Sequence, residues 1–263
     1  MYRFGLIGFG KMGSAIIEGA IKNNVLNKSE LLICVKREEQ YLDLTMCGYN
    51  VTLSNEDIYK KCDIILLAIK PQMLDEVGIK AYDYNFENKC IASILAGVKI
   101  DRLKSIFKNA EIVRIMPNTP ALIAKCVATI SYTSDNENVK SVLDIFKCIG
   151  EYEIIDERLM DETLPLNGSM PAYIYLFIKL FIENALKNGV DYEVAKMLAV
   201  NTIKASCDMI LESNDSIDTL ISNVCSKGGT TISGLDKLYS NGFDKAIEEC
   251  YNACMNRSKE LSK

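Results

Sequence analysis

The feature that most constrains the fold is the glycine pattern Gly8-Phe9-Gly10-Lys11-Met12-Gly13 near the start of the chain. An apolar run of strand type at 3–8 precedes it, and a helical pattern at about 11–24 follows. In this setting the first glycine permits a tight turn, the second lets the backbone approach a pyrophosphate, and the third lets the helix pack on the strand. The helix N-terminus offers free N–H groups to phosphates. Residues 8–13 are therefore predicted to bind a dinucleotide, the alternative being a glycine turn without a ligand.

Up to about residue 155, short apolar runs alternate with helical patterns. The strands are expected at 3–8, 31–35, 64–69, 90–95, 111–116 and 127–132, and the helices near 11–24, 38–47, 55–61, 71–82, 100–108 and 136–149. Strand runs without polar alternation indicate burial on both faces, as in a parallel sheet covered by helices. We therefore expect an α/β fold whose N-terminal part is a Rossmann-type doubly wound sheet.

After residue 156 the strand signals stop. Helices are expected at about 156–188, 191–213, 215–224, 231–240 and 243–261, with a proline kink at Pro171 inside the first. We therefore predict a dinucleotide-binding domain at 1–155 and an all-α C-terminal domain at 156–263. The run 172–181 is apolar apart from Lys179, so this helix must be buried on several sides. Either a second subunit or an intramolecular core would cover it.

Composition excludes several classes of protein. The formal net charge of -5 argues against a nucleic-acid partner, and no apolar run approaches the roughly 18 residues of a membrane span. The 10 cysteines are scattered without a C-x-x-C pair, and there are 0 histidines, so neither a metal site nor a histidine-based nucleophile pair is expected. Reduced thiols and a start without a charged leader predict a cytoplasmic protein.

The end of the second predicted strand bears on the choice of dinucleotide. NAD enzymes carry Asp or Glu there to accept hydrogen bonds from the ribose hydroxyls. This strand ends with Lys36 and Arg37, and two cations suit a 2'-phosphate that no acidic residue would repel. NADPH is therefore favoured over NADH, which stays an alternative. An ordinary surface charge pair with Glu38 and Glu39 is the other interpretation.

Three further motifs lie where predicted elements end. They are Ala68-Ile69-Lys70-Pro71-Gln72, Arg114-Ile115-Met116-Pro117-Asn118-Thr119-Pro120 and Ser226-Lys227-Gly228-Gly229-Thr230-Thr231. The first two follow strands, and their prolines suit a helix start and a rigid turn. In the third, glycines free the backbone between two helices and a threonine can cap the second, which makes an anion site. Each motif can also be an ordinary turn.

Together with the glycine loop, these motifs resemble the pyrroline-5-carboxylate reductase family over nearly the whole chain. The resemblance implies an oxidoreductase acting on CH–NH groups, which reduces 1-pyrroline-5-carboxylate to L-proline with NADPH in the last step of proline biosynthesis. It places Ala68, Lys70, Pro71 and Asn118 beside the cofactor. It also places the imino acid carboxylate at the third motif, through Ser226, Gly228, Gly229, Thr230 and Thr231, and Thr231 or water would relay a proton. It further implies a homodimer through the helical domain that completes the site, with larger assemblies of dimers in such proteins.

Three departures from the family pattern leave the substrate open. The family usually shows Ser-Gly-Ser-Gly-Pro-Ala-Tyr where this chain has Asn167 and Met170 for the first serine and second glycine, and proline where it has Lys227. The alternatives are a reductase of another imine, a 3-hydroxy acid dehydrogenase with Lys179 as the nearest proton donor, and a non-catalytic NADPH-binding sensor. The assembly size, regulation by proline and the proton donor are not decided by the sequence.

Overall fold

The computed structural model describes residues 1–261 and divides into two compact units. The first unit contains Met1–Pro171 together with the chain from Cys254 on, and the second contains Ala172–Ala253. The contacts therefore place the division after residue 171 instead of 155, and return the end of the chain to the first unit. The division at 155 marks where strands end and helices begin, and as a division of function it stays a prediction.

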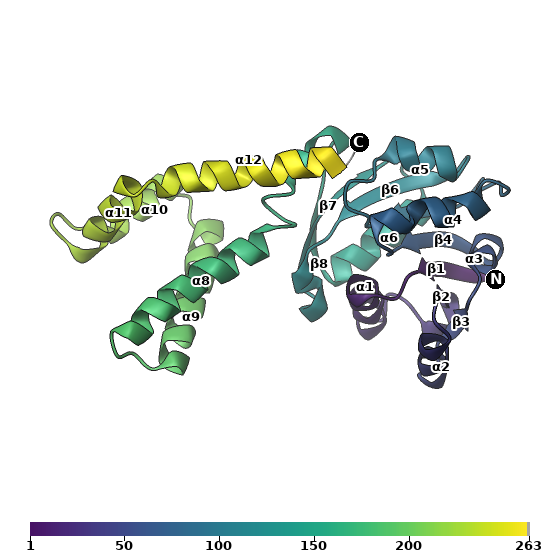
Figure 1. The fold of residues 1–263 in the computed structure, drawn as a ribbon, viewed down its shortest axis with the longest axis horizontal. Coiled ribbons are helices and arrows are strands. Elements are labelled where there is room, and N and C mark those ends of the chain that lie inside the picture. Colours follow the sequence, from purple (N-terminus) through teal and green to yellow (C-terminus); the bar gives the residue numbers. More distant parts are fainter. Residues whose placement is uncertain (262–263) are drawn as a thin grey trace. The chain divides into compact units, whose positions relative to one another are not determined.

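The first unit holds a sheet of eight strands in the order β3-β2-β1-β4-β5-β6-β7-β8 (Figure 1). The strands are β1 (Tyr2–Ile7), β2 (Leu31–Cys34), β3 (Asn50–Thr52), β4 (Cys62–Leu67), β5 (Cys90–Ser93), β6 (Glu111–Met116), β7 (Cys126–Tyr132) and β8 (Gly150–Ile154). Neighbours are parallel except β6 and β7. The strand order reverses at β1 and β4, and in such sheets ligands bind beyond the carboxyl ends of the strands at the reversal.

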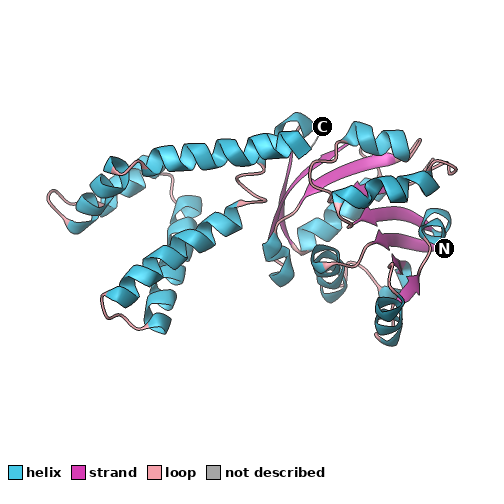
Figure 2. Cartoon of the chain, in the orientation of Figure 1, coloured by secondary structure: helices cyan, strands magenta, loops and turns pink. Residues whose placement is uncertain are grey.

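Helices cover both faces of this sheet (Figures 1 and 2). One face packs against α1 (Lys11–Lys22), α2 (Glu38–Met46) and α6 (Glu137–Cys148), and the other against α3 (Asn55–Lys61), α4 (Leu74–Ala81) and α5 (Ile100–Ile106). Successive strand residues serve opposite faces, so Leu6 belongs to the first core and Ile7 to the second. The Rossmann-type doubly wound sheet is confirmed.

The predicted strands and helices of the first unit are present, but two strands escaped prediction. β3 has only three residues, and β8 has the sequence GEYEI with mostly exposed side chains, so neither has an apolar run to reveal it. The sheet is parallel, as expected, except that β7 runs antiparallel to β6. Only residues 117–125 join β6 to β7, including the short helix η3 (Thr119–Ile123), and a parallel crossover needs a longer connection.

The turn around Pro171 also differs from the prediction. The expected first long helix is divided into η4 (Glu157–Leu159), α7 (Met160–Thr163) and α8 (Met170–Lys187). Pro171 is therefore the second residue of α8 and does not kink a continuous helix. A first-turn residue needs no backbone N–H donor, so proline is tolerated there.

The second unit contains α9 (Tyr192–Glu212), α10 (Ile217–Val224), α11 (Thr230–Ser240) and most of α8 and of α12 (Phe243–Leu261). Its apolar side chains are largely exposed: in α8 only Ile182 is buried, while Leu176 and Phe181 are 54% and 56% exposed. Contacts within the chain therefore cover only part of this helix, since Phe177 packs on Phe243 of α12 while much of the remaining apolar surface is exposed. No helix within residues 1–261 has the length and apolar character needed to cross a membrane.

Candidate functional site

The three glycines of the loop after β1 differ in whether the fold itself requires glycine at their positions. Gly8 has φ of +95°, and a Cβ there would lie 2.7 Å from the Ala68 carbonyl oxygen. A Cβ at Gly13 would lie 2.7 Å from the Gly8 carbonyl oxygen, whereas a Cβ at Gly10 would meet nothing within 4 Å. Packing within the chain therefore requires the first and third glycines but not the second. The open space over Gly10, at the uncapped N-terminus of α1, fits a pyrophosphate.

The loop forms one wall of a cleft of about 390 Å³ in the first unit. Six of the residues predicted to bind the cofactor line it: Gly8, Phe9, Gly10, Lys36, Arg37 and Ala68. Six others do not: Lys11, Met12, Gly13, Lys70, Pro71 and Asn118. Lys11 and Lys70 are exposed, and Met12 packs on the core. Lys11, Met12 and Gly13 form the first turn of α1, directly after the glycine loop.

The other residues that line the cleft were not predicted from the sequence. They are Ile7, Cys34, Val35, Gln40, Leu53, Asn55, Ile69, Met73, Glu76, Val77 and Lys80. Gln40 donates from Nε2 to the Phe9 carbonyl oxygen at 2.8 Å and so holds the glycine loop. Met73, Glu76, Val77 and Lys80 share one face of the α4 region at helical spacing. That spacing, directly after the Lys70-Pro71 motif, is the signal that could have found them.

The thiol of Cys34 is a proton donor inside this cleft. Burial raises the pKa of Cys34 to about 11, so the group stays protonated at neutral pH. Its Sγ donates to Asn55 Oδ1 at 3.0 Å. This contact joins the end of β2 to the start of α3 and fixes Asn55 at the wall of the cleft.

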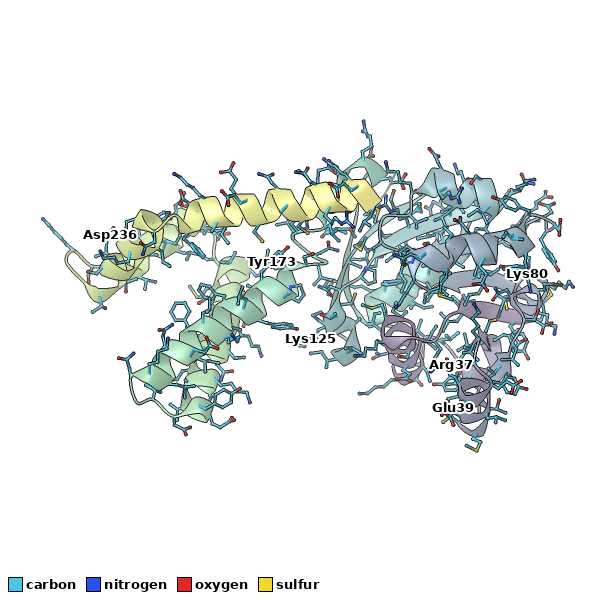
Figure 3. All side chains as sticks on the ribbon, viewed as in Figure 1. Arg37, Glu39, Lys80, Lys125, Tyr173 and Asp236 are labelled. Carbon is cyan, nitrogen blue, oxygen red and sulfur yellow. The ribbon has the colours of Figure 1, made fainter. Side chains whose placement is uncertain are left out.

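The charges around the cleft are mixed. Lys36, Arg37 and Lys80 contribute cations, and Glu76 contributes a carboxylate (Figure 3 labels Arg37 and Lys80). Lys36 Nζ lies 2.7 Å from Glu76 Oε1, so the alternative interpretation, a surface pair with Glu38 and Glu39, does not hold for Lys36. α4 also brings the Glu76 carboxylate into this cleft from a distant part of the sequence, which the residues at the end of the second strand gave no reason to expect.

Asn118 and Asn167 hold each other at the carboxyl end of β6. Asn118 Nδ2 donates to the Asn167 carbonyl oxygen at 3.2 Å, and Asn118 Oδ1 accepts from the Val127 N–H at 2.9 Å. Asn167 Nδ2 donates to the Met116 carbonyl oxygen at 2.8 Å. Both side chains are buried. This geometry gives Asn118 a role in fixing the turn after β6, and gives Asn167 a structural reason to differ from the family's serine.

The Ser226–Thr231 loop belongs to the second unit and is mostly exposed. Gly228 has φ of +72°, which favours glycine, and a Cβ at Gly229 would lie 2.2 Å from Ser226 Oγ, so the serine hydroxyl would have to move. Gly229 is the N-cap of α11 without a side-chain cap, and the expectation that a threonine caps this helix was wrong. Thr230 and Thr231 are its first two residues. Their N–H groups have no partner within the helix, which suits an anion.

Comparison with known proteins covers the whole chain. Residues 157–261 match the family described as pyrroline-5-carboxylate reductase dimerisation, and residues 3–97 match the family described as NADP oxidoreductase coenzyme F420-dependent. The pyrroline-5-carboxylate reductase of Escherichia coli K12 is 31% identical over 265 residues, which cover 99% of this chain and 98% of that protein. The chain belongs to the pyrroline-5-carboxylate reductase family.

Solved structures of the pyrroline-5-carboxylate reductase family have the same fold. The crystal structure of Plasmodium falciparum pyrroline carboxylate reductase with NADP bound is 31% identical, with a TM-score of 0.90 over 100% of this chain and 98% of that one. The 1-pyrroline-5-carboxylate reductase of Streptococcus pyogenes is 30% identical, with a TM-score of 0.88 over 98% of both chains. The resemblance drawn from the motifs is therefore confirmed.

Proposed function

We propose that this chain reduces 1-pyrroline-5-carboxylate to L-proline with NADPH. The observation that carries the proposal is the pairing of full-length family similarity with a cleft whose glycine loop leaves open space only over Gly10. The reaction consumes one imino acid, one NADPH and one proton, and yields one proline and one NADP⁺. This chemistry needs no histidine, because a cyclic imine can arrive already protonated.

The residues of the first unit hold the dinucleotide in this proposal. The N–H groups of residues 10–13 bind the pyrophosphate at the start of α1. Lys36 and Arg37 bind the 2'-phosphate, while Ala68 lines the cleft beside them. Lys70 and Pro71 shape the turn beyond β4, and Asn118 acts through the turn that it holds after β6. When bound, NADPH supplies the hydride for the carbon of the C=N bond.

The Ser226–Thr231 loop holds the substrate in this proposal. The free N–H groups at the start of α11, the Gly228-Gly229 backbone and the Ser226 and Thr230 hydroxyls bind the carboxylate. Thr231 is exposed in the first turn, where its hydroxyl can relay a proton to the ring nitrogen. The loop and the dinucleotide cleft belong to different units, so both must be correctly assembled for turnover.

A dehydrogenase of 3-hydroxy acids is not favoured. Its proton donor would be Lys179, but Lys179 Nζ pairs with Glu183 Oε1 at 2.9 Å on the exposed face of α8. Neither the matched families nor the relatives compared above bear the name of such an enzyme. Another imine as substrate and a non-catalytic sensor are the alternatives that the assay below separates.

In this proposal the chain forms a homodimer through its helical domain, residues 156–263, and it functions in the cytoplasm. The match of residues 157–261 to a dimerisation family supports the first statement, as do the exposed apolar side chains of α8. All ten cysteines are free, which suits a reducing compartment. Assembly of several dimers is part of the proposal.

The test is the loss of NADPH absorbance with purified protein and 1-pyrroline-5-carboxylate, with 1-pyrroline-2-carboxylate in parallel. Wild type should oxidise NADPH rapidly with the first compound and slowly with the second. Thr231→Val should lower kcat/KM about 100-fold and Thr231→Ser much less, since a hydroxyl is what relays the proton. Tight NADPH binding without turnover of either compound would contradict the proposal and indicate a sensor.

A further inference from the structure

The dinucleotide cleft contains one carboxylate whose presence the proposed function does not explain. Glu76 lies on α4, and its side chain reaches Lys36 from across the cleft. Lys36 Nζ lies 2.7 Å from Glu76 Oε1 and 2.9 Å from Oε2. Both side chains line the same cleft and are more than half exposed, at 67% and 63%. The ion pair therefore joins the loop after β2 to α4 where solvent can reach both partners.

We propose that Glu76 is a specificity-determining residue that weakens the preference of this cleft for NADPH over NADH. The inference rests on the proposed function only in taking this cleft as the dinucleotide site. In this proposal Lys36 has two competing partners, the carboxylate of Glu76 and a 2'-phosphate. NADPH separates the pair, and NADH leaves it intact.

The two dinucleotides meet different electrostatic surroundings. A 2'-phosphate attracts Lys36, Arg37 and Lys80 through charge-assisted hydrogen bonds. Once Lys36 turns to the phosphate, the carboxylate of Glu76 loses its partner and lies near a group of the same sign. With NADH there is no such repulsion. A free 2'-hydroxyl can instead donate to a carboxylate, as it does to the acidic residue at the end of the second strand in NAD enzymes.

Glu76 supplies from α4 the carboxylate that is absent at the end of β2. The end of β2 carries cations, which alone would favour NADPH strongly. The carboxylate on α4 makes the affinities of the cleft for NADPH and NADH more similar. Because the pair is exposed and screened by salt, the effect is moderate, and we expect about a threefold to tenfold change in relative affinity on its removal.

The experiment measures the Kd values of NADPH and NADH by calorimetry, without substrate, at low and at high salt. Glu76→Gln should raise the ratio of the NADH Kd to the NADPH Kd about threefold to tenfold, and high salt should reduce that gain. Asp75→Asn is the matched control, since the neighbouring Asp75 pairs with Arg102, which lies outside the cleft. It should leave the ratio unchanged. Lys36→Gln should lower the ratio more in the Glu76→Gln background than in wild type, because Lys36 is then free for the phosphate.

The outcomes separate this inference from the proposed function. If both dinucleotides bind and Glu76→Gln changes the ratio no more than Asp75→Asn, the inference is wrong while the cleft remains the dinucleotide site. If wild type binds neither dinucleotide, the proposed function and the inference fall together. A ratio that rises in Glu76→Gln alone, with an unchanged thermal unfolding temperature, supports the inference, because loss of folding would weaken both affinities equally.

Discussion

At the scale of single residues, the glycine loop separates folding from binding. Gly8 adopts a backbone conformation that an L side chain rarely takes and presses against Ala68. Gly10 has φ of -89° and ψ of -174°, which any residue can adopt, and its surroundings are open. The first glycine is therefore needed by the fold, and the second is needed only by what binds above it.

This difference predicts opposite effects of two alanine substitutions. Gly10→Ala should change the free energy of unfolding by less than about 0.5 kcal/mol and weaken NADPH binding about tenfold or more, because a methyl group enters the space of the pyrophosphate. Gly8→Ala should cost about 1–2 kcal/mol from its backbone conformation, before any clash. Urea unfolding and NADPH titration check both. Wild-type affinity in Gly10→Ala would mean that the pyrophosphate lies elsewhere.

The positions of cleft residues were predictable where the signal is local. The glycine spacing, Lys36 and Arg37 stand next to the strands whose ends they occupy. The partners of Asn118 and Lys36 were not predictable, because Asn167 and Glu76 reach them through the tertiary fold. A charge pair between neighbours in sequence is the natural expectation, and only the packing of α4 shows that the true partner of Lys36 lies 40 positions away.

At the scale of elements, a buried ionic network ties the last turns of α12 to the sheet within the first unit. Arg114 on β6 is 1% exposed and donates from Nη1 to Glu157 Oε1 at 3.1 Å. Its Nη2 lies 3.6 Å from Asp161 Oδ1 on α7, and Ser258 of α12 donates to the same oxygen at 2.6 Å. Residues of four elements, β6, η4, α7 and α12, therefore meet around one guanidinium.

Removal of this guanidinium should destabilise the first unit. Arg114→Ala leaves Glu157 and Asp161 without their buried cation, and we expect a loss of about 3 kcal/mol in the free energy of unfolding. Arg158→Ala is the control, because Arg158 pairs with Asp156 on the surface and is 88% exposed. Its loss should be below about 1 kcal/mol. Urea unfolding of the two variants compares them, and equal losses would contradict the structural role given to Arg114.

Elements with a strong pattern were predictable, and short or polar ones were not. Six strands and the long helices follow from apolar periodicity. β3 is too short to show a pattern, and β8 presents glutamates to solvent instead of apolar residues to a core. β7 runs antiparallel to β6 because the connection before it is short. The apolar pattern of β7 predicts a strand but does not predict its direction.

At the scale of the whole molecule, the second unit exposes the surface that a dimer would bury. Phe181 is 56% exposed although its ring packs 4.8 Å from that of Phe177, and Tyr175, Leu176 and Leu180 on the same helix are also exposed. Patches of this kind on a helical unit mark interaction sites. The match of residues 157–261 to a family described as pyrroline-5-carboxylate reductase dimerisation supports the proposal that the partner is a second copy of this chain.

A charge placed in this surface should separate the subunits. Phe181→Glu should shift the mass found by analytical ultracentrifugation from dimer toward monomer and lower turnover, since burying an unpaired carboxylate is costly. Met46→Glu is the control, because Met46 is 81% exposed on α2 of the first unit. That variant should keep the wild-type mass. A dimer that persists in Phe181→Glu would place the interface elsewhere.

The helices of the C-terminal half were predictable from the sequence, but the extent of their exposed apolar surface was not. The apolar character around most of α8 indicated that the helix is covered, and only the exposed fractions show that the chain itself covers it in part. The Ser226–Thr231 loop was recognised from its motif, whereas its helix cap was not, because Gly229 occupies the N-cap position that was expected of a threonine.

The most direct test of the proposed reaction follows the hydride itself. The protein is incubated with 1-pyrroline-5-carboxylate and NADPH that carries deuterium at the transferable position, and the product is analysed by mass spectrometry and NMR. The proposed function predicts one L-proline for each NADPH oxidised, with a single deuterium on the ring carbon that was double-bonded to nitrogen. Oxidation of NADPH without labelled proline, or no oxidation at all, would contradict it.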